Sequence, residues 1–296
     1  MVFMATRLAY IGTGIMGLPM AGHLLAAGHR LTVHTRTRAR AEPLLARGAA
    51  WADSPAAAAS AADVVFMCVP DTPDVEAVVL GGKGIMESAR AGLRVVDHST
   101  ISPSATRRLA EALAQKGSHF LDAPVSGGDV GARNATLSIM VGGEESAFNE
   151  VKGLLQLVGK TVVYCGVSGS GQFTKLVNQI LVSITNLGVC EALTFAGRNG
   201  LDLNKTLSVL SGGAANSWQL ANLAPKMIGG DFSPGFMIDL MQKDLRLVMQ
   251  AAQEAKLCLP AAGLVHHLFA AAQAAGRGKD GTQALFTVMQ RLANPA

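Results

Sequence analysis

Residues 8–37 restrict the fold more than any other part of this sequence. An apolar run, 8–11, leads into Gly12-x-Gly14-x-x-Gly17. A helix-compatible segment without charge, 18–27, and a second strand-like run, 30–34, follow. Strand, glycine turn, helix and strand within about thirty residues is the context in which this pattern binds a dinucleotide. A simple strand–helix–strand crossover is the alternative.

Each glycine of this turn has a separate expected role. Gly12 permits a tight turn, Gly14 lets the backbone approach a pyrophosphate, and Gly17 lets the helix pack against the strand. The free N–H groups and the positive dipole end of the helix then face the phosphates. Ile15 and Met16, between the last two glycines, are included in the predicted cofactor site.

The end of the second strand indicates which dinucleotide is bound. NAD sites usually place Asp or Glu there to bind the ribose 2′-hydroxyl. Here the residues are Thr35, Arg36 and Thr37, and the first carboxylate is Glu42. A guanidinium flanked by hydroxyls favours a 2′-phosphate. We therefore predict NADP, recognised by Arg36, with NAD still possible; a merely solvated basic loop is the alternative.

Composition argues against several other classes of protein. Of the 296 residues only 16% are charged, and the net charge of +4 arises from scattered basic residues, so nucleic-acid binding is not expected. The four cysteines are far apart and the histidines form no ligand pair, which argues against disulfides and metal sites. The longest apolar helix candidate, 176–190, is judged too short and too polar to span a bilayer. Without a signal-peptide pattern, a cytoplasmic protein that contacts no membrane is expected.

The first half of the chain alternates apolar strands with helices. This order predicts an α/β fold of the Rossmann type, with a doubly wound, mostly parallel sheet covered on both faces. Ligands bind at the carboxyl ends of such strands. Expected strand ends therefore place the loops 69–71, 99–100 and 124–128 beside the glycine turn, and Val69, Pro70 and Thr100 are predicted cofactor contacts.

The pattern becomes helical near residue 165. One long helix is expected over 172–198, and further helices follow to residue 292 with no alternating strands. We predict two domains, a dinucleotide-binding domain at 1–165 and an all-helical substrate and dimerisation domain at 166–296, linked by the long helix.

Three groups of residues have the chemistry of a reaction site. Ser126-Gly127-Gly128 follows a strand and offers N–H groups and a hydroxyl to a carboxylate, or is a simple turn. Lys175, Asn178 and Gln179 are three and four positions apart and share one helix face, where a lysine can exchange a proton or merely be solvated. Lys243-Asp244 is either a surface ion pair or a contact to the cofactor.

These groups resemble, together with the glycine turn, the β-hydroxyacid dehydrogenase family of 3-hydroxyisobutyrate dehydrogenase and tartronate semialdehyde reductase. Its four signatures occur in order over nearly the whole chain, as IGTGIMGLPMAGHLL, DAPVSGGDVGARNATLSIMVGG, GSGQFTKLVNQ and PGFMIDLMQKDL. Two positions depart from the family pattern: His23 stands where Asn is usual, and Ala135 where Gly usually precedes Thr-Leu.

The resemblance implies a role for each group. Lys175 is implied as the catalytic acid/base and Asn178 as the residue that orients the substrate. The Ser126-Gly127-Gly128 loop is implied to hold the substrate carboxylate. Thr100 lies near the nicotinamide, and Lys243 closes the site from the helical domain.

The implied activity is hydride transfer between NADP(H) and a short β-hydroxy acid or semialdehyde. An imine reductase and a non-catalytic NADP-binding protein are the alternatives, although imine reductases commonly lack the lysine. Gln179 is a further candidate substrate contact, and Trp218 either lines the pocket or belongs to the helical core. A homodimer or homotetramer is expected from the long apolar helix.

Overall fold

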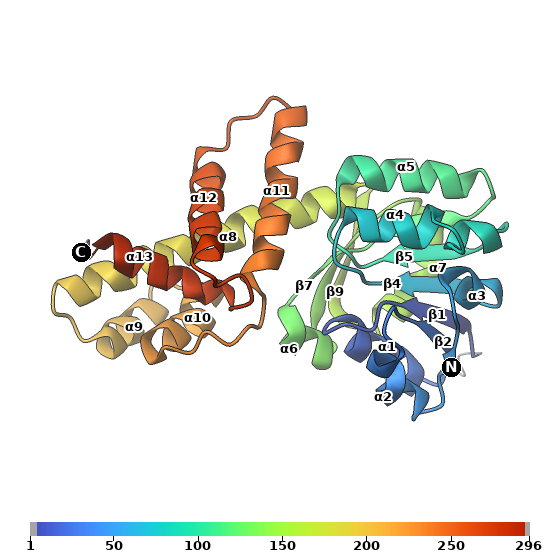
Figure 1. Cartoon of the computed structure of the whole chain (residues 1–296), viewed down its shortest axis with the longest axis horizontal. Coiled ribbons are helices and arrows are strands. Elements are labelled where there is room, and N and C mark those ends of the chain that lie inside the picture. The colour runs from blue at the N-terminus through green and yellow to red at the C-terminus, as the bar shows by residue number, and fades with distance from the viewer. Residues whose placement is uncertain (1–4, 294–296) are drawn as a thin grey trace. The chain divides into compact units, whose positions relative to one another are not determined.

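The computed structural model describes residues 5–293 of the chain. It divides into two compact units, Met1–Lys175 and Leu176–Ala296. Each unit has its own hydrophobic core. Figure 1 labels most of the helices and strands of both units.

The first unit is built on a single sheet in the order β3-β2-β1-β4-β5-β6-β8-β7, with β9 paired to β8. The strands are β1 (Arg7–Ile11), β2 (Arg30–His34), β3 (Ala50–Trp51), β4 (Val64–Met67), β5 (Arg94–Asp97), β6 (His119–Asp122), β7 (Val125–Ser126), β8 (Leu137–Gly142) and β9 (Gly159–Gly166). Neighbours from β3 to β6 are parallel, whereas β8 runs antiparallel to β6 and β7. The order 3-2-1-4-5-6 is that of a Rossmann sheet, which confirms the predicted fold class.

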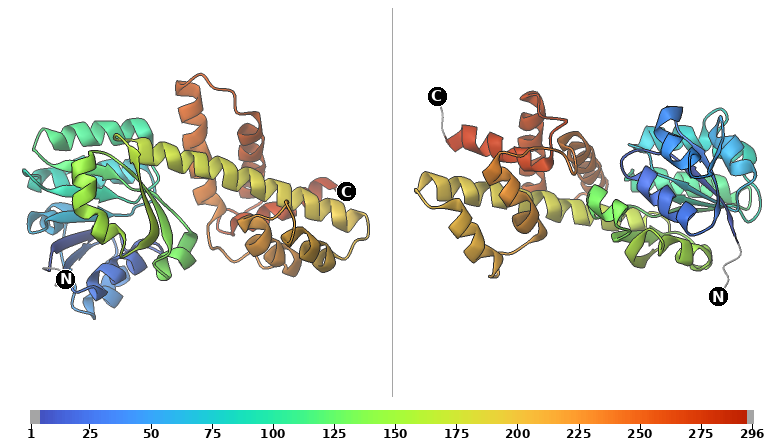
Figure 2. Two further views of the ribbon diagram at one scale, coloured as in Figure 1. Left: turned by 180° about the vertical axis from the view of Figure 1, so that it is seen from behind. Right: turned by 90° about the horizontal axis from the view of Figure 1, so that it is seen from below.

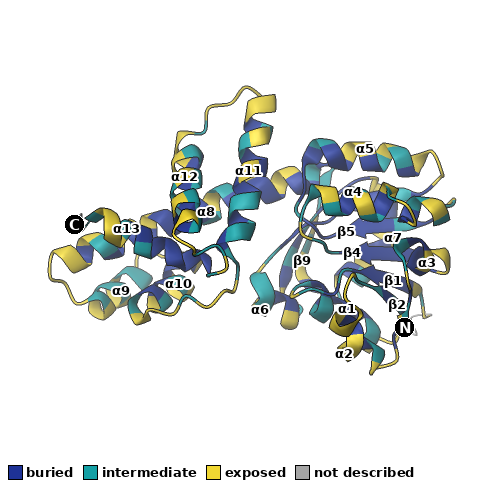
Figure 3. Cartoon of the chain, in the orientation of Figure 1, coloured by how far each residue is buried: buried dark blue, intermediate teal, exposed yellow. Residues whose placement is uncertain are grey.

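Side-chain alternation along the strands divides the core into two layers. Leu8 and Tyr10 of β1 pack with α1, α2, α6 and α7, while Ala9 and Ile11 face α3, α4 and α5. The central strands β1, β4, β5 and β6 are accordingly almost entirely buried, whereas β9 is mostly half-buried or exposed (Figure 3). The helices are α1 (Gly17–Ala26), α2 (Glu42–Leu45), α3 (Pro55–Ser60), α4 (Thr72–Leu80), α5 (Pro103–Ala114), α6 (Gly128–Arg133) and α7 (Glu145–Leu155).

Helices α3, α4 and α5 begin at similar local signals. Ser54, Asp71 and Ser102 each accept a hydrogen bond from a backbone N–H of the first turn, and a proline follows within two positions. The loop expected at 69–71 therefore ends where α4 begins, at Thr72.

The region 124–165 differs most from the sequence prediction, which assigned no element there. Val125–Ser126 is a short strand rather than loop, and Gly128 begins α6. Strands β8 and β9 and helix α7 complete this region. Strand β8 pairs antiparallel with β6 and β7 and parallel with β9, so this region continues the sheet beyond the parallel strands β3 to β6.

The second unit is all helical (Figure 2). It contains α9 (Leu203–Ser211), α10 (Trp218–Gly229), α11 (Ile238–Glu254), α12 (Pro260–Ala274) and α13 (Leu285–Ala293). The later turns of α8 (Ser170–Arg198) bury Leu187, Cys190 and Leu193 against these helices. The boundary between the units lies after Lys175, inside α8.

Helix α8 also corrects the prediction about membrane-spanning length. It is one continuous helix of 29 residues, long and apolar enough to cross a bilayer by length and composition alone. Core helices of soluble proteins meet the same criterion, and α8 buries part of its surface inside the protein.

Candidate functional site

The glycine turn after β1 has the packing that the sequence predicted. A Cβ atom at Gly12, whose φ is +93°, would collide with the carbonyl oxygen of Cys68, and one at Gly17 would collide with that of Gly12. At Gly14, by contrast, no atom lies within 4 Å of the Cβ position. Two glycines are thus required by packing, and the third leaves its surroundings open. This arrangement fits a dinucleotide, whose pyrophosphate needs close approach to the backbone.

Helix α1 begins at Gly17, and no side chain caps its N-terminus. Ile15, just before it, is exposed. The backbone N–H groups of this turn are therefore of the kind that bind phosphate at a helix start.

The end of β2 presents Arg36 to solvent. Its side chain is 81% exposed, and its Nη1 atom lies 3.3 Å from Oδ1 of Asp74 in the first turn of α4. Thr35 is half-buried and Thr37 is exposed. The basic residue that the sequence assigned to a 2′-phosphate thus lies next to a carboxylate from another element.

The loops after β4 and β5 are joined by Ser99. Its hydroxyl accepts a hydrogen bond of 2.9 Å from the N–H of Val69, and its own N–H donates to Asp97 at 2.8 Å. Pro70 is exposed and Thr100 is half-buried. This hydrogen bond joins the two loops, so the predicted cofactor contacts on them, Val69, Pro70 and Thr100, keep their positions relative to one another.

The first turn of α8 is held by a buried carboxylate. Asp122, at the end of β6, accepts hydrogen bonds from the N–H groups of Gly169 at 2.8 Å and Gln172 at 2.9 Å. Burial raises the pKa of the Asp122 carboxyl, and the backbone donors oppose that rise. Gly171 packs so closely against β6 and β8 that a Cβ atom there would collide with the Met140 carbonyl.

Lys175 lies one turn further along α8 and is buried, with only 7% of its surface exposed. Asn178 and Gln179 follow on the same helix face. Burial distinguishes Lys175 from a lysine on a solvated face, because a charged side chain is seldom buried without a specific role.

The Ser126-Gly127-Gly128 segment joins β7 to α6. Ser126 pairs with Ser138 of β8, and both glycines have positive φ angles, +131° and +63°. Ala135, between α6 and β8, also has a positive φ of +54°. The usual family glycine at that position is thus explained by backbone conformation.

His23, the other departure from the family pattern, connects α1 to α6. Its Nε2 atom lies 3.0 Å from the carbonyl oxygens of both Ala132 and Arg133. His23 therefore joins α1 to α6, and both helices pack on the same face of the sheet.

A chain of buried and half-buried polar side chains joins α8 to α11 in the second unit. Asn178 donates to Oε1 of Gln179 at 2.7 Å, and Gln179 donates to Oδ2 of Asp244 at 2.6 Å. Lys243 lies 2.7 Å from the other Asp244 oxygen, and these two side chains are 14% and 2% exposed. The hypothesis of a surface ion pair is therefore wrong.

Trp218 begins α10, where Ser217 caps the helix by accepting a hydrogen bond from the N–H of Leu220. The indole is 62% exposed. It does not belong to the core of the helical unit, so only its candidate role at a substrate site stands as a prediction.

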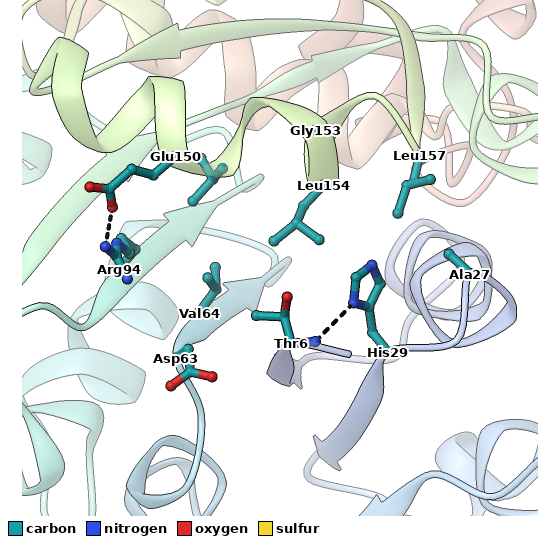
Figure 4. Close-up of a pocket in the computed structure, with 11 residues that line it drawn as sticks. Thr6, Ala27, His29, Asp63, Val64, Arg94, Glu150, Gly153, Leu154 and Leu157 are labelled. Carbon is teal, nitrogen blue, oxygen red and sulfur yellow. Dashed lines mark hydrogen bonds and ion pairs between the residues drawn. The ribbon is translucent and has the colours of Figure 1, made fainter. Parts of the chain in front are cut away.

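A cavity of about 360 Å³ lies elsewhere in the first unit (Figure 4). Thr6, Asp63 and Arg94 line it from the amino ends of β1, β4 and β5, and His29 lies beside them. Ligands of open α/β sheets bind at the carboxyl ends of the strands. This cavity is therefore distinct from the predicted cofactor region.

Sequence analysis assigned no role to two polar residues that connect the candidate groups, Asp122 and Gln172, and it did not predict the hydrogen bond between Gln179 and Asp244. Asp122 gave a detectable signal, because a carboxylate ends an otherwise apolar strand. Gln172 gave none, since its partners are distant in sequence. Among residues 5–293, no cluster of three metal-ligating side chains occurs.

Comparison with known proteins gives matches along nearly the whole chain. Residues 7–166 match the NAD-binding domain model of 6-phosphogluconate dehydrogenase, and 169–289 match the model described as NAD-binding of NADP-dependent 3-hydroxyisobutyrate dehydrogenase. The 2-hydroxy-3-oxopropionate reductase of Escherichia coli is 42% identical over 97% of this chain and 98% of its own length.

Two solved structures have the same architecture. A Mycobacterium tuberculosis 3-hydroxyisobutyrate dehydrogenase with L-serine has a TM-score of 0.88 at 30% identity, covering 97% of this chain and all of that one. Psf3 in complex with NADP+ and 2-OPP has a TM-score of 0.88 at 29% identity, covering 95% and 99% of the two chains.

Proposed function

The chain belongs to the β-hydroxyacid dehydrogenase family, and from that premise we propose that it transfers a hydride between NADP(H) and a short β-hydroxy acid or its semialdehyde. The family establishes an NAD(P)-dependent oxidoreductase. The substrate type proposed here is that of 3-hydroxyisobutyrate, tartronate semialdehyde or succinic semialdehyde.

The observation that supports a catalytic site is the burial of Lys175 in the early turns of α8. In the reduction, the Lys175 ammonium donates a proton to the substrate oxygen as the carbonyl becomes an alcohol. In the oxidation, the neutral amine accepts that proton. A positioned acid or base contributes about 10²- to 10⁴-fold to such a reaction.

Other residues bind and orient the substrate in this proposal. The Ser126 hydroxyl and the backbone at Gly127 and Gly128 bind its carboxylate. Asn178 orients the carbonyl, because its amide is fixed by Gln179 on the same helix. Trp218 is a proposed substrate contact that rests only on its exposure at the start of α10.

The open backbone at Gly14 fits the dinucleotide. The proposed cofactor-binding residues are Gly12, Gly14, Ile15, Met16, Gly17, Thr35, Arg36, Thr37, Val69, Pro70, Thr100 and Lys243. When bound, the nicotinamide supplies or accepts the hydride. Arg36 favours NADP because its guanidinium forms charge-assisted hydrogen bonds with phosphate.

A turnover screen tests this function. Purified protein is assayed with short β-hydroxy acids, semialdehydes and cyclic imines, with NADP and NAD side by side. We expect turnover of a β-hydroxy acid pair with NADP, and its loss in Lys175→Ala with NADPH binding retained. Lys160, an exposed lysine of β9, offers a control, and Lys160→Ala is expected to be fully active. Near-normal turnover by Lys175→Ala, or turnover of imines alone, contradicts the proposal.

We also propose a cytoplasmic location and a homodimer or homotetramer. All four cysteines are free, as is usual in a reducing compartment. Val177, Leu181 and Phe195 of α8 form an exposed apolar stripe that a second copy would cover. Sedimentation is expected to give a dimer or tetramer that Leu181→Glu dissociates, and a monomeric parent protein would contradict this assembly.

A further inference from the structure

Gln172 connects the start of α8 to the loop that contains Thr100. Its Nε2 atom donates a hydrogen bond of 2.8 Å to the carbonyl oxygen of Ser99, and its Oε1 atom accepts one of 3.1 Å from the N–H of Ile101. The two bonded residues lie on either side of Thr100. A single carboxamide thus fixes the backbone on both sides of a predicted nicotinamide contact.

The same residue is held from the opposite direction by its own backbone. The N–H of Gln172 donates to Asp122, which also accepts from Gly169. Asp122 directly precedes the segment that ends in Ser126-Gly127-Gly128. The first turn of α8 is therefore bonded both to the Thr100 loop and to the strand that leads into the proposed carboxylate-binding loop.

The burial of Gln172 indicates that this connection is specific. The residue is 0% exposed, and burying an amide is favourable only when its polar atoms are hydrogen-bonded. Lys175 lies three positions further along α8, so the orientation of the first turn also sets the position of its side chain. A displacement of about 1 Å in a reacting group can cost about 10²-fold in rate.

We propose that Gln172 is a positioning residue that fixes Lys175 relative to the Thr100 loop, an inference that rests on the proposed catalytic role of Lys175. Gln172 touches neither the substrate nor the cofactor in this proposal. It acts through the two backbone hydrogen bonds that its amide makes with Ser99 and Ile101.

Two substitutions separate this role from simple packing. Gln172→Leu fills the space but removes both hydrogen bonds. Gln172→Glu keeps the shape and is sensitive to pH: a neutral carboxyl can donate to Ser99 and accept from Ile101, whereas a carboxylate cannot donate and repels the Ser99 oxygen. The nearby titratable groups, Asp97, His98, Asp122 and Lys175, are present in every variant, so the ratio of variant to parent kcat isolates position 172.

The chain offers a matched control in the helical unit. Gln283 is 2% exposed, and its Nε2 atom donates to the carbonyl oxygens of Asp231 at 3.2 Å and Ser233 at 3.0 Å. It is a second buried glutamine that joins backbone segments, but it belongs to no proposed site. Gln283→Leu is expected to lower the melting temperature while kcat stays within about twofold of the parent value.

For Gln172→Leu we expect kcat to fall by roughly 10²-fold, with the Kd of NADPH, measured by fluorescence titration, nearly unchanged. For Gln172→Glu we expect the kcat ratio to the parent to rise as the pH falls. If the leucine variant does not fold, the glutamate variant alone provides the test. A kcat ratio for Gln172→Glu that is near one, or low but independent of pH, overturns the positioning role. A parent protein that turns over no β-hydroxy acid contradicts the proposed function instead.

Discussion

Nε2 of Gln179 donates a 2.6 Å hydrogen bond to Oδ2 of Asp244, 65 residues away in the sequence. The same carboxylate pairs with Lys243 through its other oxygen. Asp244 is thus a central, buried member of the polar chain that ends at Asn178. The orientation of the amides on α8 in this unit depends on a charge contributed by α11.

Substitution of Asp244 should therefore be costly. Asp244→Asn removes the buried carboxylate that pairs with Lys243, and breaking a buried pair in this way costs about 3 kcal/mol or more. Urea unfolding should show this loss, and Lys243→Met combined with Asp244→Asn should recover most of it. Glu76→Gln, which breaks an exposed pair with Arg108, should cost less than about 1 kcal/mol. An equal loss of unfolding free energy in Asp244→Asn and in Glu76→Gln would refute the argument.

His98 makes stability depend on pH. Its Nδ1–H donates to the Ala123 carbonyl at 2.7 Å, and complete burial lowers its pKa from 6.5 to about 4. The unfolded chain therefore binds a proton more readily than the folded one between these values. Stability is fully present above pH 6.5 and falls as the pH drops towards 4, by about 3 kcal/mol from this residue.

His98→Asn tests that dependence, because an amide can still donate to Ala123 but does not titrate. Unfolding free energies measured by urea from pH 7 to pH 4.5 should fall less steeply in the variant. Burial also lowers the pKa of His29 and His266, so the slope should flatten rather than vanish. If the unfolding free energy depends on pH equally in His98→Asn and in the parent protein, His98 does not cause this dependence.

Ala135 offers a stabilising substitution. An L-residue in the left-handed region costs roughly 1–2 kcal/mol, and glycine avoids this at a backbone entropy cost of about 0.5–1 kcal/mol. Ala135→Gly should therefore stabilise the protein by about 0.5–1 kcal/mol and raise the melting temperature by about 1–3 °C. Ala57→Gly, in the exposed part of α3, should instead lower the melting temperature. A lower melting temperature for Ala135→Gly would contradict the prediction.

The features that sequence analysis predicted are those with local signals. The strand predicted at 30–34 has the bounds of β2, because its residues alternate between apolar and polar and Gly28 ends the helix before it. Glycine spacing likewise indicated the turn at Gly12, where backbone conformation and crowding leave no alternative. Such signals depend on neighbouring residues and need no knowledge of the fold.

The features it missed depend on residues that meet only in the folded chain. Strand β8 is an apolar run, but its antiparallel pairing with β7 depends on the turn through Ala135. Asp122 could be noticed as a carboxylate in an apolar strand, yet its partners lie 47 and 50 residues ahead. Exposure is similarly invisible in sequence, which is why Trp218 remained ambiguous.

The contact between Arg36 and Asp74 allows a prediction about cofactor choice. Arg36 is almost fully accessible, and a hydrogen bond between charged groups contributes about 1.5–3 kcal/mol. Arg36→Ala should therefore weaken NADP binding about 10- to 100-fold and leave NAD binding nearly unchanged. Isothermal titration calorimetry with NADP and with NAD measures the ratio of the two affinities. Arg108→Ala, an exposed arginine that is also paired to a carboxylate, should change neither affinity.

Asp74→Asn should shift the preference in the opposite direction. The Asp74 carboxylate lies 3.3 Å from the guanidinium, so it opposes a phosphate bound to the same group. Repulsion between unit charges about 6 Å apart in water is about 0.7 kcal/mol, or roughly threefold in affinity. The exposed ion pair contributes little to the orientation of Arg36 by comparison. NADP should thus bind Asp74→Asn about threefold more tightly, less so at high salt, with NAD unaffected. Weaker NADP binding by this variant would mean that Asp74 instead serves to orient Arg36.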